Sequence, residues 1–152
     1  ATISSGSYER LLKKLLPQAE ILSEPCPLFV PLVENGRFRQ GDVVIETVAR
    51  EYLTPLIEAG VDTLILGCTH YPLLKDIIGE ICGPGVTLID SGAASARALR
   101  QQLAAEGQLT DRQQGETRFY VSDRPEDFEK LAAVFLEEPL SRGAERIDIE
   151  QY

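Results

Sequence analysis

The sequence lacks methionine altogether, and its 152 residues include only one histidine and three cysteines. No CxxC pair is present, and an odd number of unpaired cysteines fits a reduced cytoplasm better than a disulfide scaffold. No uninterrupted apolar run approaches the roughly 20 residues that a membrane span needs, and no signal-peptide pattern opens the chain. We therefore expect a cytoplasmic protein without a membrane partner.

Basic residues are also few. Fifteen Lys and Arg stand against 24 Asp and Glu, which gives a net charge of −9. Nucleic acids and anionic membranes are both bound through basic patches, so neither is expected as a partner. Apolar residues make up 43% of the chain and charged residues 26%, as is ordinary for a soluble globular protein with a hydrophobic core.

The motifs of several common active sites are missing too. The chain contains no Walker loop, no GxGxxG and no Ser-His-Asp arrangement. Its most distinctive stretch is GCTHYP at residues 67–72, which follows the apolar run TLIL at residues 63–66. This order predicts a strand, a turn and then a helix that starts near a proline. Ligands of open parallel sheets bind beyond the carboxyl ends of strands, where this turn would lie.

Helices and strands are predicted to alternate along the chain. Helices are expected near residues 8–16, 42–59, 72–82, 90–106 and 123–138, and strands near 18–22, 62–67, 86–89 and 118–121. Residues 23–41 contain three prolines and two glycines, and we expect a long functional loop there. The pattern indicates an α/β fold with a mainly parallel sheet. So few strands make a small sheet for a complete doubly wound domain. We therefore favour a fragment of a longer protein over a complete chain that has only lost its initiator methionine.

Cys68 is the leading candidate for chemistry. A cysteine at the end of a strand can be a small buried hydrophobe, or it can be a reactive thiol. The second interpretation gains support from His70, which could tune the thiol or shuttle a proton. Thr69 and the backbone amides of residues 69–71 could receive a carboxylate, as the first turn of a helix does.

Other titratable residues give weaker signals. Glu34 stands out by its place in the long loop, although a loop glutamate is usually a solvated residue. Cys82 falls on the apolar face of a predicted helix, and Cys26 lies between two prolines with no motif around it. A zinc site fits poorly, because a Cys-x-His neighbour pair is not a usual ligand spacing. We therefore predict no metal.

The run LILGCTHYPLL at residues 64–74 closely resembles the second cysteine motif of bacterial glutamate racemases, members of the aspartate/glutamate racemase superfamily. Further segments resemble the same family in the same order: ATI followed by SGSYE near the start, PLVE at residues 31–34, IDS at 89–91 and FYV at 119–121. Related aspartate racemases usually carry an acidic residue at the position of His70, so the histidine favours glutamate.

The resemblance implies racemisation without a cofactor, in which one cysteine removes the α-proton of glutamate and a second one protonates the opposite face. Cys68 matches the cysteine that deprotonates L-glutamate. His70 and Glu34 match residues that assist this thiol, and Thr69, His70 and Thr2 match substrate-contacting positions. The product, D-glutamate, would serve peptidoglycan synthesis.

The family's N-terminal half, with its own cysteine before Asn-Thr, has no counterpart in this sequence. We expect the C-terminal portion of a three-layer, parallel-sheet racemase, with residues 1–88 forming most of the second domain and residues 89–152 completing the first. The missing N-terminal half would then be a partner, and the chain alone would be inactive. The sequence leaves open whether the protein forms a homodimer.

Two other interpretations stay open beside this one. The chain could be a binding module without catalysis, for example a truncated paralogue. It could also derive from a sibling racemase or decarboxylase that acts on another acid.

Overall fold

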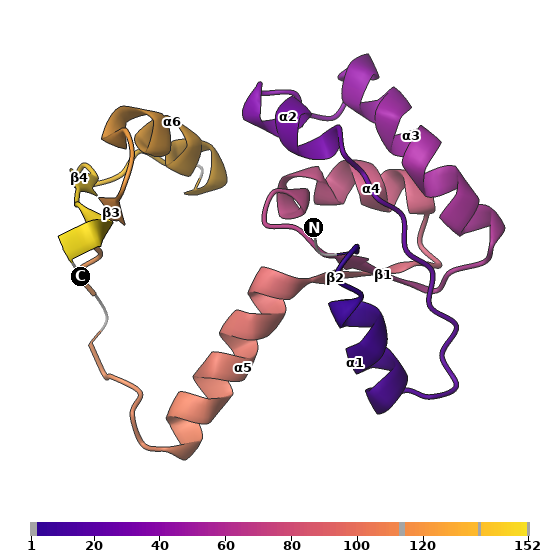
Figure 1. Ribbon diagram of the computed structural model, residues 1–152, viewed down its shortest axis with the longest axis horizontal. Helices are drawn as coiled ribbons and strands as arrows, with labels where there is room; N and C mark the ends of the chain where they lie inside the picture. Colours follow the sequence, from indigo (N-terminus) through magenta and orange to yellow (C-terminus); the bar gives the residue numbers. More distant parts are fainter. Residues whose placement is uncertain (1–2, 113–114, 137, 152) are drawn as a thin grey trace. The chain divides into compact units, whose positions relative to one another are not determined.

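The computed structural model describes residues 3–112, 115–136 and 138–151 (Figure 1). The chain forms two compact units that divide between Glu106 and Gly107, and each unit is described by itself. The predicted domain boundary between residues 88 and 89 is a different division and stays a prediction.

The first unit contains a pair of parallel strands with helices before, between and after them. In chain order its elements are α1 (Ser7–Leu15), α2 (Phe29–Glu34), α3 (Val43–Glu58), β1 (Thr63–Leu66), the 3-10 helix η1 (Tyr71–Leu74), α4 (Lys75–Cys82), β2 (Thr87–Asp90) and α5 (Ser91–Ala105). The strands β1 and β2 pair in parallel, with Thr63 opposite Thr87 and Leu66 opposite Asp90. This confirms the predicted α/β class with a parallel sheet.

The hydrophobic core lies between β1 and the helices α2, α3 and α4, which Figure 1 shows grouped on one side of the strand pair. Helix α3 supplies four buried residues, Ile45, Ala49, Leu53 and Leu56, at the spacing of one helical face. The other core residues come from α2, β1, η1 and α4: Phe29, Val33, Leu66, Leu74, Ile77 and Ile78. The turn after β1 is therefore anchored on both sides, by Leu66 before it and Leu74 after it.

Several predicted helix boundaries are confirmed by their caps. The Asp42 carboxylate accepts a hydrogen bond from the Val44 amide at 3.0 Å and so begins α3. Gly60 follows α3 with a φ of 75°, a left-handed conformation that glycine adopts without strain. Asp90 accepts a hydrogen bond from the Ala93 amide at 3.0 Å and begins α5.

Two expectations about local structure were wrong. Residues 18–22 form no strand within the described chain. The supposedly irregular loop at residues 23–41 contains α2, whose Pro31 falls in the first helical turn, where a missing N–H costs no internal bond. The helix predicted after the GCTHYP turn is present, and it begins as the 3-10 helix η1 before it continues as α4.

The second unit is small and builds its own parallel pair from β3 (Tyr120–Val121) and β4 (Glu145–Arg146). Helix α6 (Pro125–Leu136) connects them, and a 3-10 turn, η2 (Ile149–Gln151), ends the described chain. The Glu129 carboxylate accepts a hydrogen bond from the Ala144 amide at 2.8 Å and holds β4 near the helix.

Candidate functional site

The GCTHYP turn lies at the carboxyl end of β1, as its sequence predicts. The neighbouring strand ends beside it, and the Ser91 hydroxyl donates a hydrogen bond to the Leu66 carbonyl at 3.4 Å. An added Cβ on Gly67 would meet no atom within 4 Å, so there is open space next to the turn. Cys68 is half-buried at this edge, where ligands of parallel sheets bind.

The structure brings His70 together with Glu34, although 36 residues separate them in the sequence. His70 Nε2 lies 3.2 Å from Glu34 Oε1. The histidine side chain is 17% exposed and the glutamate side chain 50%. Glu34 is the last residue of α2, so this helix, which the sequence did not predict, carries the carboxylate to the turn. A carboxylate at this distance orients the imidazole ring.

The second ring nitrogen of His70 faces Thr69. The Thr69 hydroxyl oxygen lies 3.3 Å from His70 Nδ1, within hydrogen-bonding distance. Thr69 is exposed, so its hydroxyl is accessible to a ligand at the turn. The two ring nitrogens of His70 are therefore oriented by different partners, Glu34 on one side and Thr69 on the other.

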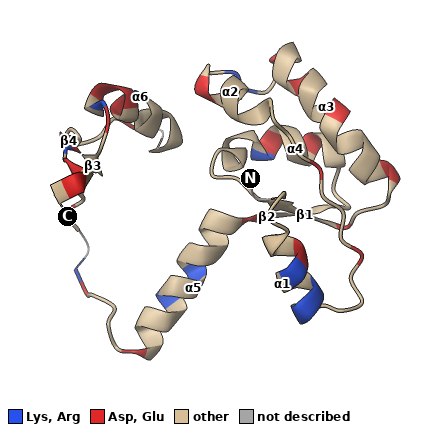
Figure 2. Cartoon of the chain, viewed as in Figure 1, with Lys and Arg blue, Asp and Glu red and all other residues tan. Residues whose placement is uncertain are grey.

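The backbone of the turn departs from one expectation. The Tyr71 amide donates to the Cys68 carbonyl at 3.2 Å and is thus used within the turn itself. A carboxylate bound at the turn therefore cannot rely on the amide of residue 71. Positive charge is scarce around the turn: Lys75 is the one Lys or Arg between positions 62 and 90, and Figure 2 shows acidic residues on α2, α3 and α4. A bound carboxylate therefore depends on the side-chain donors of the turn itself.

Cys26, to which the sequence assigned no role, lies close to the turn. The Tyr71 hydroxyl donates a hydrogen bond to the Cys26 carbonyl oxygen at 3.3 Å. The pKa of the Cys26 thiol is raised to about 11, chiefly by burial and in addition by the charge of Glu24, and the Tyr71 hydroxyl partly offsets both effects. At neutral pH the Cys26 thiol therefore stays protonated and is a poor base or nucleophile. Burial also raises the pKa of Cys82.

Thr2, the remaining predicted contact, lies outside the described residues. Within the described ranges, no group of three or more His, Cys, Asp or Glu could hold a metal ion, and no helix is long and apolar enough to cross a membrane.

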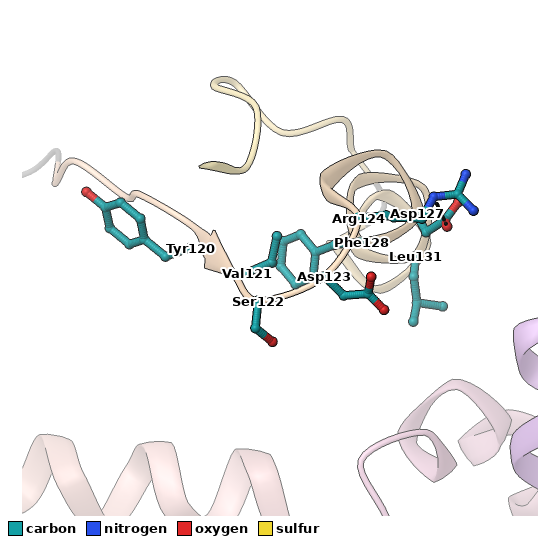
Figure 3. Close-up of a pocket in the computed structure, with 8 residues that line it drawn as sticks. All are labelled: Tyr120, Val121, Ser122, Asp123, Arg124, Asp127, Phe128 and Leu131. Atoms are coloured by element: carbon teal, nitrogen blue, oxygen red, sulfur yellow. Dashed lines mark ion pairs between the residues drawn. The ribbon is translucent and has the colours of Figure 1, made fainter. Parts of the chain in front are cut away.

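A cavity of about 440 Å³ lies in the second unit and does not involve the GCTHYP turn (Figure 3). It is lined by Tyr120, Val121, Ser122, Asp123, Arg124, Asp127, Phe128 and Leu131. Arg124 and Asp127 form an ion pair across 3.2 Å in its wall. The lining contains neither cysteine nor histidine, so we assign the chemistry to the turn after β1.

Comparison with known proteins finds glutamate racemases as sequence relatives. No family model matches the chain. The glutamate racemase of Geobacter metallireducens is 44% identical over 137 residues, covering 89% of this chain and 50% of the relative. The glutamate racemase of Syntrophus aciditrophicus is 41% identical over 150 residues, covering 97% of this chain and 54% of the relative. The chain thus spans about half the length of these curated relatives.

Solved structures agree with the sequence relatives. Glutamate racemase from Francisella tularensis, in complex with D-glutamate, matches with a TM-score of 0.86 at 35% identity, over 100% of this chain and 56% of its own. Glutamate racemase from Thermus thermophilus, in complex with β-chloro-D-alanine, matches with a TM-score of 0.83 at 38% identity, over 100% of this chain and 55% of its own.

Proposed function

We propose that this chain, which over nearly its whole length is similar in sequence and fold to about half of a glutamate racemase, is the C-terminal portion of such an enzyme. The complete enzyme would interconvert L- and D-glutamate in the cytoplasm without a cofactor and supply D-glutamate for peptidoglycan. The observation that carries the proposal is the position of Cys68, with the His70–Glu34 pair beside it, at the carboxyl end of β1.

Cys68 acts as one of two opposed bases in this proposal. Its thiolate removes the α-proton of L-glutamate, and a cysteine of the N-terminal half donates a proton to the opposite face. The exchange leaves Cys68 as a thiol and the second cysteine as a thiolate, so the reverse reaction starts from the product state. An α-proton of an amino acid is only weakly acidic, and the reaction therefore requires a base held in contact with it.

The neighbours of Cys68 support this step in two ways. His70, oriented by Glu34 at 3.2 Å, lies two residues after Cys68 in the same turn and would exchange a proton with the thiol or with the substrate. Thr69 and His70, together with Thr2, would bind the carboxylates of the substrate. Donors aimed at a carboxylate stabilise the negative charge that develops on it when the α-proton leaves.

The chain alone is expected not to racemise glutamate, because it carries only one cysteine in a racemase motif. The test compares it with a completed enzyme, in which residues 1–152 are joined to the part of the Geobacter metallireducens racemase that they do not match. Circular dichroism of the glutamate solution, started from either enantiomer, measures the reaction. We expect interconversion by the completed enzyme and none by the 152-residue chain.

Two results would contradict the proposal. Racemisation by the 152-residue chain alone would show that a second base is present in it. A completed enzyme that is folded but inactive would favour the binding-module interpretation, and activity on another amino acid would favour a sibling racemase.

A further inference from the structure

Two polar contacts join the GCTHYP turn to the two ends of helix α2. One is the 3.2 Å contact between His70 Nε2 and Glu34 Oε1, at the last residue of α2. The other is at the opposite end of the helix, where the Cys26 carbonyl oxygen accepts hydrogen bonds from the Phe29 amide and from the Tyr71 hydroxyl, both at 3.3 Å. Neighbouring residues of the turn, 70 and 71, therefore hold the two ends of one helix.

Helix α2 depends on such external contacts for its position. It has six residues, and an isolated helix of this length is unstable in water. Two buried residues one turn apart, Phe29 and Val33, fix the face that it presents to the core. The Phe29 ring packs edge-on against the Tyr71 ring, with centroids 5.3 Å apart and an interplanar angle of 88°.

The contact between His70 and Glu34 cannot hold α2 by itself. Glu34 is a flexible side chain that is half exposed, and exposed ion pairs contribute little free energy. The Tyr71 hydroxyl bonds to backbone instead, at a residue 45 positions earlier in the chain. A backbone contact of this kind fixes where the helix starts, and the start of a short helix determines where its end lies.

We propose that Tyr71 is a positioning residue whose hydroxyl holds the start of α2 so that Glu34, at the end of α2, meets His70. The inference about catalysis rests on the proposed function, because Glu34 and His70 matter there by assisting Cys68. Its structural part stands on the Tyr71–Cys26 bond and the His70–Glu34 pair alone.

The ionisation of Tyr71 is compatible with this role. Burial raises the pKa of the Tyr71 hydroxyl above its usual range, and the charges of Cys26 and Cys68 raise it further. The hydroxyl therefore stays protonated at neutral and mildly alkaline pH. It remains a hydrogen-bond donor to the Cys26 carbonyl throughout that range.

The single histidine of the chain makes the structural part directly testable by NMR. The ring signals of the 152-residue chain, prepared without a histidine tag, all belong to His70. We expect Glu34→Gln to move these signals and Tyr71→Phe to move them toward the same position. In a chain that already carries Glu34→Gln, Tyr71→Phe should cause no further movement.

Tyr52→Phe is the matched control. The Tyr52 ring also packs edge-on against Phe29, at 5.3 Å and 75°, so this variant removes a hydroxyl from the same aromatic cluster. It should leave the His70 signals in place. The proposal is overturned if Glu34→Gln or Tyr71→Phe leaves the signals unmoved, or if the two movements simply add.

Kinetics of the completed enzyme test the catalytic part. Loss of one hydrogen bond through Tyr71→Phe is expected to lower kcat by about three- to tenfold with little change in KM. In a Glu34→Gln background the same change should have no further effect, whereas an equal loss in both backgrounds would overturn the inference. An inactive wild-type completed enzyme would refute the proposed function instead, and the NMR result would still decide the role of Tyr71.

Discussion

Replacing Cys68 by alanine in the completed enzyme is expected to abolish measurable racemisation in both directions. General acid–base groups contribute rate factors of about 10² to 10⁴, and alanine leaves no acid or base at position 68. The half-buried thiol lies at the carboxyl end of β1, next to the open space beside Gly67. The measurement is kcat from L-glutamate and from D-glutamate, followed by circular dichroism.

Cys82→Ala is the matched control for this loss. Cys82 is the last residue of α4 and packs against the hydrophobic core, so its removal should leave kcat close to that of the wild type. Cys68→Ser, which keeps the size of the side chain but not the thiol, should be as inactive as Cys68→Ala. Racemisation retained in either Cys68 variant would contradict the assignment of this residue as a base.

The second large effect concerns the stability of the fold around the site. Phe29→Ala is expected to lower the free energy of unfolding by about 3–5 kcal/mol, the usual cost of removing a large aromatic side chain from a core. Phe29 is 1% exposed and contacts the rings of both Tyr52 and Tyr71. Its loss would leave a cavity between α2, α3 and η1.

Urea unfolding of the 152-residue chain measures this effect. Leu28→Ala is the control, because Leu28 precedes Phe29 directly but is 49% exposed. The control should change the unfolding free energy by less than about 1 kcal/mol, as is usual for exposed positions. A Phe29→Ala variant as stable as the Leu28→Ala variant would show that α2 is not anchored through the Phe29 ring.

Local signals in the sequence predicted most of the first unit. Asp42 and Gly60 mark the two ends of α3, and both act there as caps. The apolar run at residues 63–66 followed by glycine predicted β1 and the turn that carries Cys68. These features depend on neighbours within a few positions, and for that reason a single sequence reveals them.

The parts that sequence reasoning missed depend on contacts between distant segments. Helix α2 contains Pro31 in a stretch full of turn formers, and its stability comes from burying Phe29 and Val33 rather than from its own propensity. The bond from Tyr71 to the Cys26 carbonyl joins positions 45 residues apart. Glu34 was singled out by its place in the long loop and by the resemblance of PLVE to racemases, and the pairing with His70 appeared only in the folded chain.

The first turnover of the completed enzyme in D₂O tests the central claim most directly. If Cys68 and a cysteine of the other half act on opposite faces, the thiol that protonates the product carries deuterium from the solvent before substrate binds. At low conversion from L-glutamate, proton NMR should then show D-glutamate deuterated at the α-carbon while the remaining L-glutamate keeps its proton. D-glutamate that carries the substrate's own proton would indicate a single base and would contradict the account.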